Sequence, residues 1–208
     1  MSQIILDISA NTHRNDMRYV KRMIDNIKSI DTGKHEIIFK HQLFEKAGAN
    51  LPLDHAVFDY AYEYAKHSGY KTTSSVFDIA SLSFLLKYDP CFVKIANNRK
   101  LDWLIGEVPR RVPIYVSVGD GTEGRRMDYE VNRILHCVSK YPSTIEDYET
   151  AFFSGEVKFA ISDHSIGLDL FKKYQPQIWE KHYVLEHDEN NLDGGLFATT
   201  PTELEAIL

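Results

Sequence analysis

The stretch VKFAISDHSIG, residues 157–167, has the form of a short apolar strand that ends in polar residues before a glycine. The stretch QIWEKHYV, residues 177–184, repeats this form. Because alternate residues of a strand share a face, Ser162 and His164 lie on one face of the first segment, and Glu180 and His182 on one face of the second. The two stretches therefore predict strands whose shared face becomes polar at its end.

Similar apolar runs recur along the chain and alternate with segments of helical period. The candidate strands are residues 3–8, 36–41, 70–75, 91–96, 113–118, 133–138, 157–162 and 177–184. Helical period is found at 15–30, 54–69, 78–88 and 100–108. This alternation is typical of a parallel sheet with crossover helices, and eight such units predict a (β/α)8 TIM barrel.

The chain is short for this fold, because 208 residues lie near its lower limit of about 200. Some helices must therefore be shortened or missing. The glycine-rich segment 119–132 leaves little room for a fifth helix, and the eighth helix, within 200–208, runs to the end of the chain. No linker or low-complexity tract divides the sequence, so we expect a single TIM-barrel domain over residues 1–208.

Composition restricts the class of protein. The formal net charge of −6 argues against a nucleic-acid partner, because nucleic-acid-binding domains usually carry a clustered basic excess. No run approaches the roughly 18 apolar residues of a membrane span, and the N-terminus lacks a signal pattern, so we expect a cytoplasmic protein without a membrane partner. Cys91 and Cys137 both lie in apolar strand-like runs, where we expect reduced core thiols rather than a disulfide or a metal pair.

The two-residue period places polar residues near the end of one face of every predicted strand. In a TIM barrel, such residues gather at the C-terminal rim of the strands, where sites are built. The strand-end residues are Asp7, Lys40, Ser75, Lys94, Ser117, His136, Ser162 with His164, and Glu180 with His182. The sequence therefore predicts a polar site at this rim.

The two imidazoles of this rim predict a metal site. His164 and His182 can converge on one ion, because neighbouring parallel strands lie about 4.8 Å apart. Neutral imidazole favours a transition metal over magnesium. Nearby carboxylates, from Asp163, Glu180 and Asp193, can supply a further ligand or orient the imidazoles.

Lys40 and Lys94 predict an anion site in the same mouth. Two ammonium groups with the hydroxyls of Ser75, Ser117 and Ser162 suit a dianionic phosphate, or a phosphate plus a carboxylate. Two alternatives remain open. Asp7 and Glu180 can neutralise the lysines as structural pairs, or one lysine can form a Schiff base with a carbonyl substrate.

Some polar residues lie outside the strand ends. Tyr141 follows the sixth strand across a turn set by Pro142, where its hydroxyl can reach the mouth, although a lone tyrosine is more often a packing residue. Four histidines are expected at the surface or at helix edges: His13, His35, His55 and His67.

Three successive segments closely resemble motifs of the sialic acid synthase family: LHCVSKYPST at 135–144, ISDHSIG at 161–167 and EKHYVLEHDENNLDGG at 180–195. Earlier segments resemble the family's first five strands in order, namely IILDISAN, FKHQ, TSSVFD, VKIAN and SVGD. Members of this family condense phosphoenolpyruvate with an amino-sugar aldehyde to give a 2-keto sugar acid and phosphate. The resemblance covers roughly residues 3 to 205 and implies both the barrel and a transferase activity.

The resemblance also implies roles for the rim residues. His164 and His182 match the ligands of a catalytic divalent metal that polarises the aldehyde as a Lewis acid, Mn²⁺ in the family, with Mg²⁺, Co²⁺ or Zn²⁺ as alternatives. Asp193 matches an aspartate that contacts the sugar, and Asp7 stands where the family has a glutamate for proton handling or substrate positioning. The positions around phosphoenolpyruvate are matched by Lys40, Lys94, Ser75, Ser117, Ser162, Asn97 and Ser139, with Tyr141 lining the same site.

Several residues depart from the family pattern. Asp7 is one methylene shorter than the family's glutamate. Thr12 stands where a histidine is usual, with His13 one residue late. Asn97 replaces a serine, and Ser139 replaces an asparagine.

The sugar-binding parts of the family are also reduced in this sequence. Segment 45–54 is shorter than the family loop that encloses the sugar. The sequence ends at Leu208, before the antifreeze-like domain whose arginine reaches the sugar of the partner subunit in the family's homodimer. We therefore expect a reduced barrel that joins phosphoenolpyruvate to a sugar aldehyde. The alternatives are a non-catalytic, metal- or ligand-binding descendant and a Schiff-base lyase or aldolase.

Overall fold

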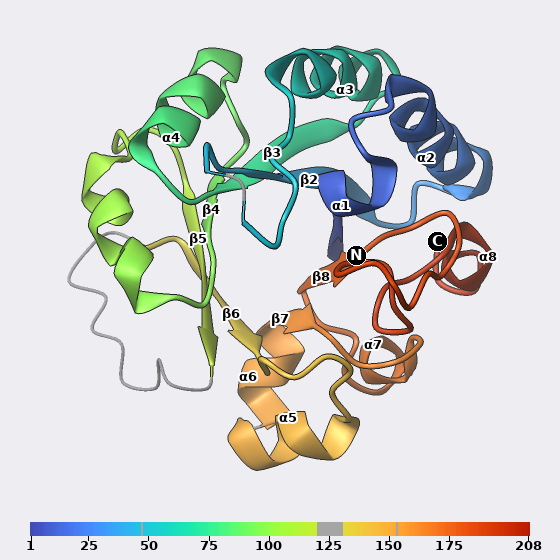
Figure 1. Ribbon diagram of the computed structural model, residues 1–208. Helices are drawn as coiled ribbons and strands as arrows, with labels where there is room; N and C mark the ends of the chain where they lie inside the picture. Colours follow the sequence, from blue (N-terminus) through green and yellow to red (C-terminus); the bar gives the residue numbers. More distant parts are fainter. Residues whose placement is uncertain (47, 120–130, 153) are drawn as a thin grey trace.

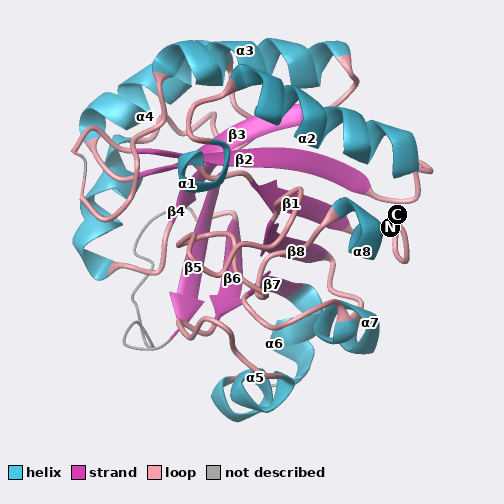
Figure 2. Cartoon of the chain, turned by 45° about the vertical axis from the view of Figure 1, so that its right-hand side comes forward, coloured by secondary structure: helices cyan, strands magenta, loops and turns pink. Residues whose placement is uncertain are grey.

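The computed structural model describes residues 1–46, 48–119, 131–152 and 154–208. Its strands form a closed parallel barrel in the order β1 to β8, which confirms the predicted TIM-barrel fold (Figures 1 and 2). The strands are β1 (Gln3–Asp7), β2 (Glu36–Leu43), β3 (Lys71–Val76), β4 (Val93–Ile95), β5 (Ile114–Gly119), β6 (Arg133–Cys137), β7 (Ala160–Asp163) and β8 (Ile178–His182).

Helices surround the strands in both views (Figures 1 and 2). The α-helices are α1 (Ala10–His13), α2 (Met17–Ile30), α3 (His55–His67), α4 (Ile79–Leu85), α5 (Ile145–Ala151), α6 (Ser154–Phe159), α7 (Asp169–Tyr174) and α8 (Pro201–Leu204). Two 3-10 segments follow β3 and β4, η1 (Leu86–Tyr88) and η2 (Arg99–Glu107). Several helices are thus short, as expected, and the segment for a fifth helix falls largely on residues 120–130, outside the described residues.

Helix α2 illustrates how the outer layer is built. Asp16 accepts a hydrogen bond from the backbone N–H of Arg18 and so caps the helix at its N-terminus. Residues three and four apart along one face are buried: Val20, Met23, Ile24 and Ile27. This stripe packs into the main apolar core between the helices and the outer face of the barrel.

The inside of the barrel contains an apolar layer below a polar one. Six side chains form a small separate core: Ile5, Ile38, Phe92, Leu135, Ala160 and Ile178. Two residues later on the same strands, the inward positions become polar in β1, β2, β4, β7 and β8. The apolar layer therefore closes the barrel below the polar residues and directs them toward the C-terminal mouth.

Two expectations about strands were wrong. Residues 157–159 belong to α6, so β7 begins only at Ala160. In β6, Leu135 is fully buried whereas Ile134 is 36% exposed, so His136 points outward, where its ring contacts Phe152. A slip of one residue moves every side chain of a strand to the other face. Because β6 has apolar residues at both parities, its pattern alone did not identify the inward face.

The inward residue at the end of β6 is instead Cys137, and it lies opposite Gly119 of β5. A side chain at Gly119 would not fit, because a Cβ atom there would lie 1.8 Å from the Cys137 carbonyl oxygen. Neither Cys91 nor Cys137 takes part in a disulfide bond.

The described helices are also unlike membrane-spanning helices. Within the described ranges, every helix is too short or too polar to span a bilayer.

His13 was expected at the surface or at a helix edge; it is the last residue of α1, but it is buried beside a second histidine, His41 of β2. Only 1% of His13 and none of His41 is exposed, and their ring centroids lie 6.4 Å apart. Burial lowers the pKa of His13 to about 4 and the pKa of His41 to about 3. Both imidazoles are therefore neutral at pH 7, between β2 and the helical layer.

These two histidines predict acid sensitivity of the fold. Their pKa values are lower in the folded state than the ordinary value of 6.5, so the unfolded state binds more protons below that pH. The stabilisation is fully present above pH 6.5 and is lost progressively as the pH falls from 6.5 toward the folded-state values. The parent protein should lose unfolding free energy as the pH falls from about 7 to about 5. We expect this loss, measured by urea titration, to be about 2 kcal/mol smaller in His41→Leu. His67→Gln, at an exposed position, is the control, and an unchanged loss in His41→Leu would contradict the assignment.

Candidate active site

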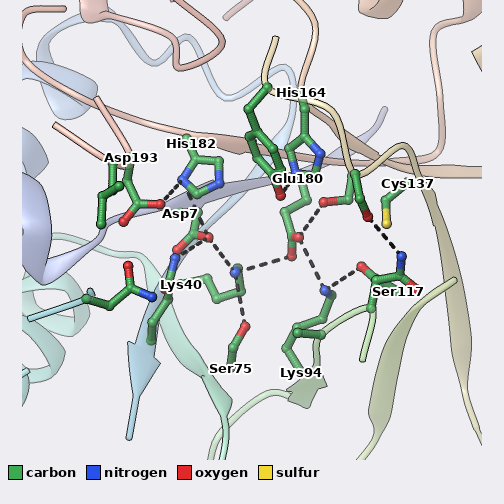
Figure 3. A pocket seen from close by; sticks show the side chains of 18 of the residues that line it. Asp7, Lys40, Ser75, Lys94, Ser117, Cys137, His164, Glu180, His182 and Asp193 are labelled. Atoms are coloured by element: carbon green, nitrogen blue, oxygen red, sulfur yellow. Dashed lines mark hydrogen bonds and ion pairs between the residues drawn. The ribbon is translucent and has the colours of Figure 1, made fainter. Parts of the chain in front are cut away.

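A cavity of about 430 Å³ opens at the C-terminal mouth of the barrel. Its walls do not include His136 or Asp163, but they include Glu180 and every other residue that the sequence predicted for the site (Figure 3). The latter are Asp7, Lys40, Ser75, Lys94, Asn97, Ser117, Ser139, Tyr141, Ser162, His164, His182 and Asp193. The structure thus brings the predicted residues together, while their chemical roles remain predictions.

Lys40 lies among acceptors from neighbouring strands. Its Nζ atom is 2.8 Å from Asp7 Oδ2 and 3.1 Å from Ser75 Oγ, and it donates a hydrogen bond to each. Glu180 Oε2 lies 3.6 Å from the same ammonium group. Gln42, two residues further along β2, donates to Asp7 Oδ2 as well. Lys40 is therefore held at the centre of the mouth between two carboxylates.

Lys94 completes this network from β4. Its Nζ atom donates to Ser117 Oγ at 2.7 Å and lies 3.3 Å from Glu180 Oε1. The Ser162 hydroxyl donates to the same Glu180 oxygen at 2.8 Å. Glu180 thus bridges both lysines (Figure 3). The pairing that the sequence left open as an alternative is present, and both ammonium groups also line the cavity.

Burial and charge set the protonation of this network. Burial alone would raise the pKa of Glu180, but the two lysines and the Ser162 hydroxyl outweigh it and lower the pKa to about 2. Burial also opposes the charge on Lys40, yet Asp7 and Glu180 together raise its pKa. The pKa of Lys94 is lowered, because burial and the neighbouring Lys40 outweigh Glu180. Lys94 is therefore the amine that loses its proton more readily.

His164 is held in one tautomer. Its Nδ1 atom lies 2.7 Å from the Val138 carbonyl oxygen, which can only accept, so Nδ1 carries the hydrogen and Nε2 the lone pair. Tyr141 Oη lies 3.2 Å from this Nε2 atom. Burial and the adjacent His182 lower the pKa of His164 to about 3, so the ring is neutral at physiological pH.

His182 lies beside His164, with a ring-centroid separation of 5.8 Å. Its Nδ1 atom is 3.6 Å from Asp193 Oδ1 and 3.9 Å from Asp7 Oδ2. That nitrogen is buried and makes no hydrogen bond within the described part of the chain. A buried nitrogen without a hydrogen-bond partner is suited to contact a metal or substrate bound in the cavity.

These observations fit a transition metal held by two imidazoles. A carbonyl that accepts from the far nitrogen of a histidine orients the other nitrogen, as is usual for metal-binding histidines. Across the described residues, no cluster of three His, Cys, Asp or Glu side chains has metal-binding geometry. The chain would therefore supply His164 and His182, and the remaining coordination positions would be left to substrate or water.

Asp163 does not belong to the mouth, contrary to its expected role as a metal-site carboxylate. It points to the outer face of β7, where it lies 3.4 Å from Lys181 Nζ and accepts a hydrogen bond from Trp179 Nε1 at 2.9 Å. The period of two explains this placement, because Asp163 alternates with His164 and Lys181 alternates with His182. The buried pair fixes β7 to β8 directly behind the two imidazoles.

Tyr148 of α5 anchors the same strand end. Its hydroxyl donates to the Ser162 carbonyl at 2.6 Å and accepts from the backbone N–H of His164 at 3.1 Å. No sequence pattern indicates this role, because the contact depends on how α5 packs against β7.

Asn97 and Ser139, which depart from the family pattern, form a pair in the mouth. Asn97 Nδ2 donates to Ser139 Oγ at 3.1 Å. The resemblance implied a serine at the first position and an asparagine at the second. Relative to the family pattern, the amide and the hydroxyl have exchanged positions. In this chain they still form a hydrogen bond between amide and hydroxyl.

Comparison with known proteins gives this site a family context. The sequence profile of the NeuB family matches residues 28–208. The chain belongs to the NeuB family. It is 28% identical to a pseudaminic acid synthase of Helicobacter pylori, over 88% of this chain and 66% of that protein. The chain thus spans slightly less than two thirds of that curated relative.

Solved structures show the same fold as this NeuB-family chain. A putative spore coat polysaccharide biosynthesis protein E from Chromobacterium violaceum has a TM-score of 0.79 and 17% identity, covering 99% of this chain and 72% of its own. An N-acetylneuraminic acid synthetase from Leptospira borgpetersenii has a TM-score of 0.74 and 21% identity, covering 98% and 80%. At this level of identity the likeness concerns the fold.

Several residues of this NeuB-family site were not among the predicted binding residues. Gln42 follows Lys40 on the inward face of β2, so the two-residue period could have identified it. Cys137 was also missed, because the sequence did not identify which residues of β6 face inward. Asn50 and Leu192 reach the cavity from loops, for which the sequence offers no period.

The bridging position of Glu180 leads to a prediction. Glu180→Gln removes the carboxylate that both lysines share, so we expect the free energy of unfolding to fall by about 3 kcal/mol in urea titrations. Inorganic phosphate should restore part of this loss, because the two ammonium groups can then bind it without competition.

Ser162→Ala is the matched control. It removes one hydrogen bond to Glu180 but no charge, so we expect a loss of about 1 kcal/mol and no phosphate effect beyond that of the parent. Equal stabilisation of parent and Glu180→Gln by phosphate would show that the lysines do not form the anion site.

Proposed function

We propose that this NeuB-family barrel condenses phosphoenolpyruvate with the aldehyde of an amino sugar, yielding a 2-keto sugar acid and free phosphate. The observation that carries this proposal is the convergence of two buried lysines, three serine hydroxyls and two imidazoles on one cavity. The NeuB family match and the relative named pseudaminic acid synthase support a synthase of this class. The protein would accordingly be a transferase of carbohydrate biosynthesis that acts on small molecules.

The lysine half of the mouth suits phosphoenolpyruvate. Lys40 and Lys94 would bind its phosphate and carboxylate, and Ser75, Ser117 and Ser162 would donate or accept the surrounding hydrogen bonds. Asn97, Ser139 and Tyr141 line the same cavity and would complete this subsite. Ammonium groups that are already fixed by Asp7 and Glu180 need little rearrangement as negative charge shifts during the reaction.

The reaction forms one carbon–carbon bond and one carbon–oxygen bond, and it breaks the carbon–oxygen bond to the phosphate. Carbon 3 of phosphoenolpyruvate attacks the aldehyde carbon, whose oxygen gains a proton and becomes a hydroxyl. Water then adds to carbon 2, and phosphate leaves with its ester oxygen to give the keto group; the two protons of the water end on the former aldehyde oxygen and on the phosphate. Asp7 Oδ1 is buried without a hydrogen-bond partner in the described part of the chain, so it is a suitable acceptor for the proton of that water.

His164 and His182 would hold the divalent metal, for which we propose Mn²⁺, with Mg²⁺, Co²⁺ and Zn²⁺ as alternatives. When bound, the metal supplies Lewis-acid polarisation of the aldehyde. The chain's own contribution is to keep His164 neutral with Nε2 toward the mouth. Asp193, beside His182, would contact the hydroxyl groups of the sugar. A cytoplasmic location and a homodimer remain predictions.

Lys94 favours one alternative function, a Schiff-base lyase or aldolase. Its pKa is lowered by burial and by Lys40, which increases the fraction of nucleophilic amine. Borohydride reduction in the presence of pyruvate separates the two reactions. A gain in mass that disappears in Lys94→Met would support the Schiff base, and no gain would support the synthase.

The synthase is tested by calorimetric titration of phosphoenolpyruvate into metal-free and Mn²⁺-loaded protein, followed by assay of phosphate release with a panel of amino-sugar aldehydes. The mouth contains three carboxylates, Asp7, Glu180 and Asp193, against two ammonium groups. We therefore expect Mn²⁺ to tighten phosphoenolpyruvate binding by about tenfold, and phosphate release to require the aldehyde. Binding without release would indicate a non-catalytic descendant, and no binding would refute the proposal.

Variants locate the metal within the same experiment. We expect His164→Ala and His182→Ala each to weaken Mn²⁺ binding by at least about a hundredfold, measured by calorimetry. His136→Ala is the matched control, because His136 points away from the mouth at the end of β6. If all three variants bind Mn²⁺ equally well, the metal lies elsewhere.

The exchanged pair Asn97 and Ser139 gives a further prediction. Asn97→Ser and Ser139→Asn should each weaken phosphoenolpyruvate binding by about threefold to tenfold, because each removes the amide-to-hydroxyl hydrogen bond. The double variant restores one amide and one hydroxyl in the opposite order, and we expect it to recover most of the affinity. Additive losses in the double variant would show that the two residues act independently.

A further inference from the structure

Asn11 of α1 contacts two separate loops of the mouth with one side chain. Its Nδ2 atom donates to Asp193 Oδ2 at 2.5 Å and to Asn50 Oδ1 at 2.8 Å. Its Oδ1 atom accepts from the backbone N–H of Leu51 at 2.8 Å. Its carbonyl oxygen accepts from Asn191 Nδ2 at 2.7 Å. Asn11 thus joins the loop after β2 to the loop after β8.

Asn15, four residues further and just beyond the end of α1, holds the same β2–α3 loop, and within the described residues it makes no hydrogen bond to Asp193. Its Nδ2 atom donates to the Pro52 carbonyl at 3.0 Å, and its Oδ1 atom accepts from the backbone N–H of Asp54 at 3.1 Å. The two asparagines therefore hold successive parts of the loop. Asn15 provides a natural control for effects of loop anchoring alone.

The Asp193 carboxylate is oriented by these contacts. Ser9 Oγ donates to Asp193 Oδ2 at 2.5 Å, beside the Asn11 amide, whereas Oδ1 lies 3.6 Å from His182 Nδ1. One oxygen is thus occupied by the β1–α1 segment, and the other faces the mouth. Figure 3 shows Asp193 and His182 on the side of the cavity away from Lys94 and Ser117.

We propose that Asn11 is a positioning residue that couples the β2–α3 loop to Asp193 and so sets the shape of the aldehyde-binding half of the mouth. Asn50 and Asp193 both line the cavity, and Asn11 contacts both. A change in either loop is therefore transmitted to the other through one amide. The assignment to the aldehyde half rests on the proposed function, whereas the coupling between the loops does not.

The coupling is tested by hydrogen–deuterium exchange of the ligand-free protein. Asn11→Ala removes the acceptor of the Leu51 N–H, so we expect peptides within residues 48–54 to exchange about tenfold faster. Asp193→Ala should also speed exchange in these peptides, although within the described residues Asp193 makes no hydrogen bond to them, and it should do so only when Asn11 is present. No effect of Asp193→Ala, or the same effect in the Asn11→Ala background, would overturn the coupling.

Two further variants separate the contacts and guard against simple misfolding. Asn11→Asp keeps an acceptor for the Leu51 N–H but places a carboxylate beside Asp193, so exchange in the loop should rise as it does in Asp193→Ala, and aldehyde binding should be impaired. Asn15→Gly removes the second set of loop contacts and suits the left-handed backbone at that position, where φ is 58°. It should speed exchange at Asp54 without making the loop independent of Asp193.

Steady-state kinetics then test the aldehyde assignment. We expect Asn11→Ala and Asn11→Asp to raise KM for the aldehyde by about tenfold or more, with the Kd of phosphoenolpyruvate changed by less than about twofold. An equal change in both constants would indicate a general structural role and overturn the assignment. If the parent forms no product with any aldehyde, the proposed function fails, while the exchange measurements still decide whether Asn11 couples the loops.

Discussion

The site depends on one buried interaction, the bridge that Glu180 makes between Lys40 and Lys94. An ammonium group inside a barrel is unfavourable unless a carboxylate offsets its desolvation, and here one carboxylate serves two ammonium groups. The apolar layer of Ile5, Ile38 and their neighbours closes the barrel beneath. The protein can therefore present two fixed positive charges to a ligand, but that ligand must compete with Glu180 and Asp7 for them.

Strands β7 and β8 carry two functions on their opposite faces. Inward residues supply Ser162, Glu180 and the two imidazoles, while outward residues form the buried pair of Asp163 and Lys181. Because the pair lies directly behind the imidazoles, the spacing of His164 and His182 is set by interactions on the other side of the sheet. This arrangement explains why both faces of these two strands change from apolar to polar residues toward the strand ends.

The two halves of the mouth are built on different structural elements. The proposed phosphoenolpyruvate half is built mainly on strand ends, whose positions are fixed by backbone hydrogen bonds and by the barrel core. The proposed aldehyde half is built on the β2–α3 and β8–α8 loops. Asn11 fastens both loops to α1, and Asn15, just beyond α1, fastens the first of them. Loops tolerate change better than strands. The shortening of segment 45–54 relative to the family pattern therefore falls where the acceptor sugar would be selected.

The sequence by itself determined the barrel and most of the inward strand-end residues, because strand alternation has a strict period of two and the rim residues follow apolar positions on the same face. Prediction from the sequence failed where the period of two was ambiguous or did not apply. In β6, apolar residues at both parities hid Cys137; Asp163 was expected near the imidazoles, although the period of two places it on the opposite face; and His13 was buried by helices that no local pattern orients. The link from Asn11 to Asn50 and Asp193 was decided only by the tertiary structure, since these residues are distant in sequence and loop contacts follow from packing.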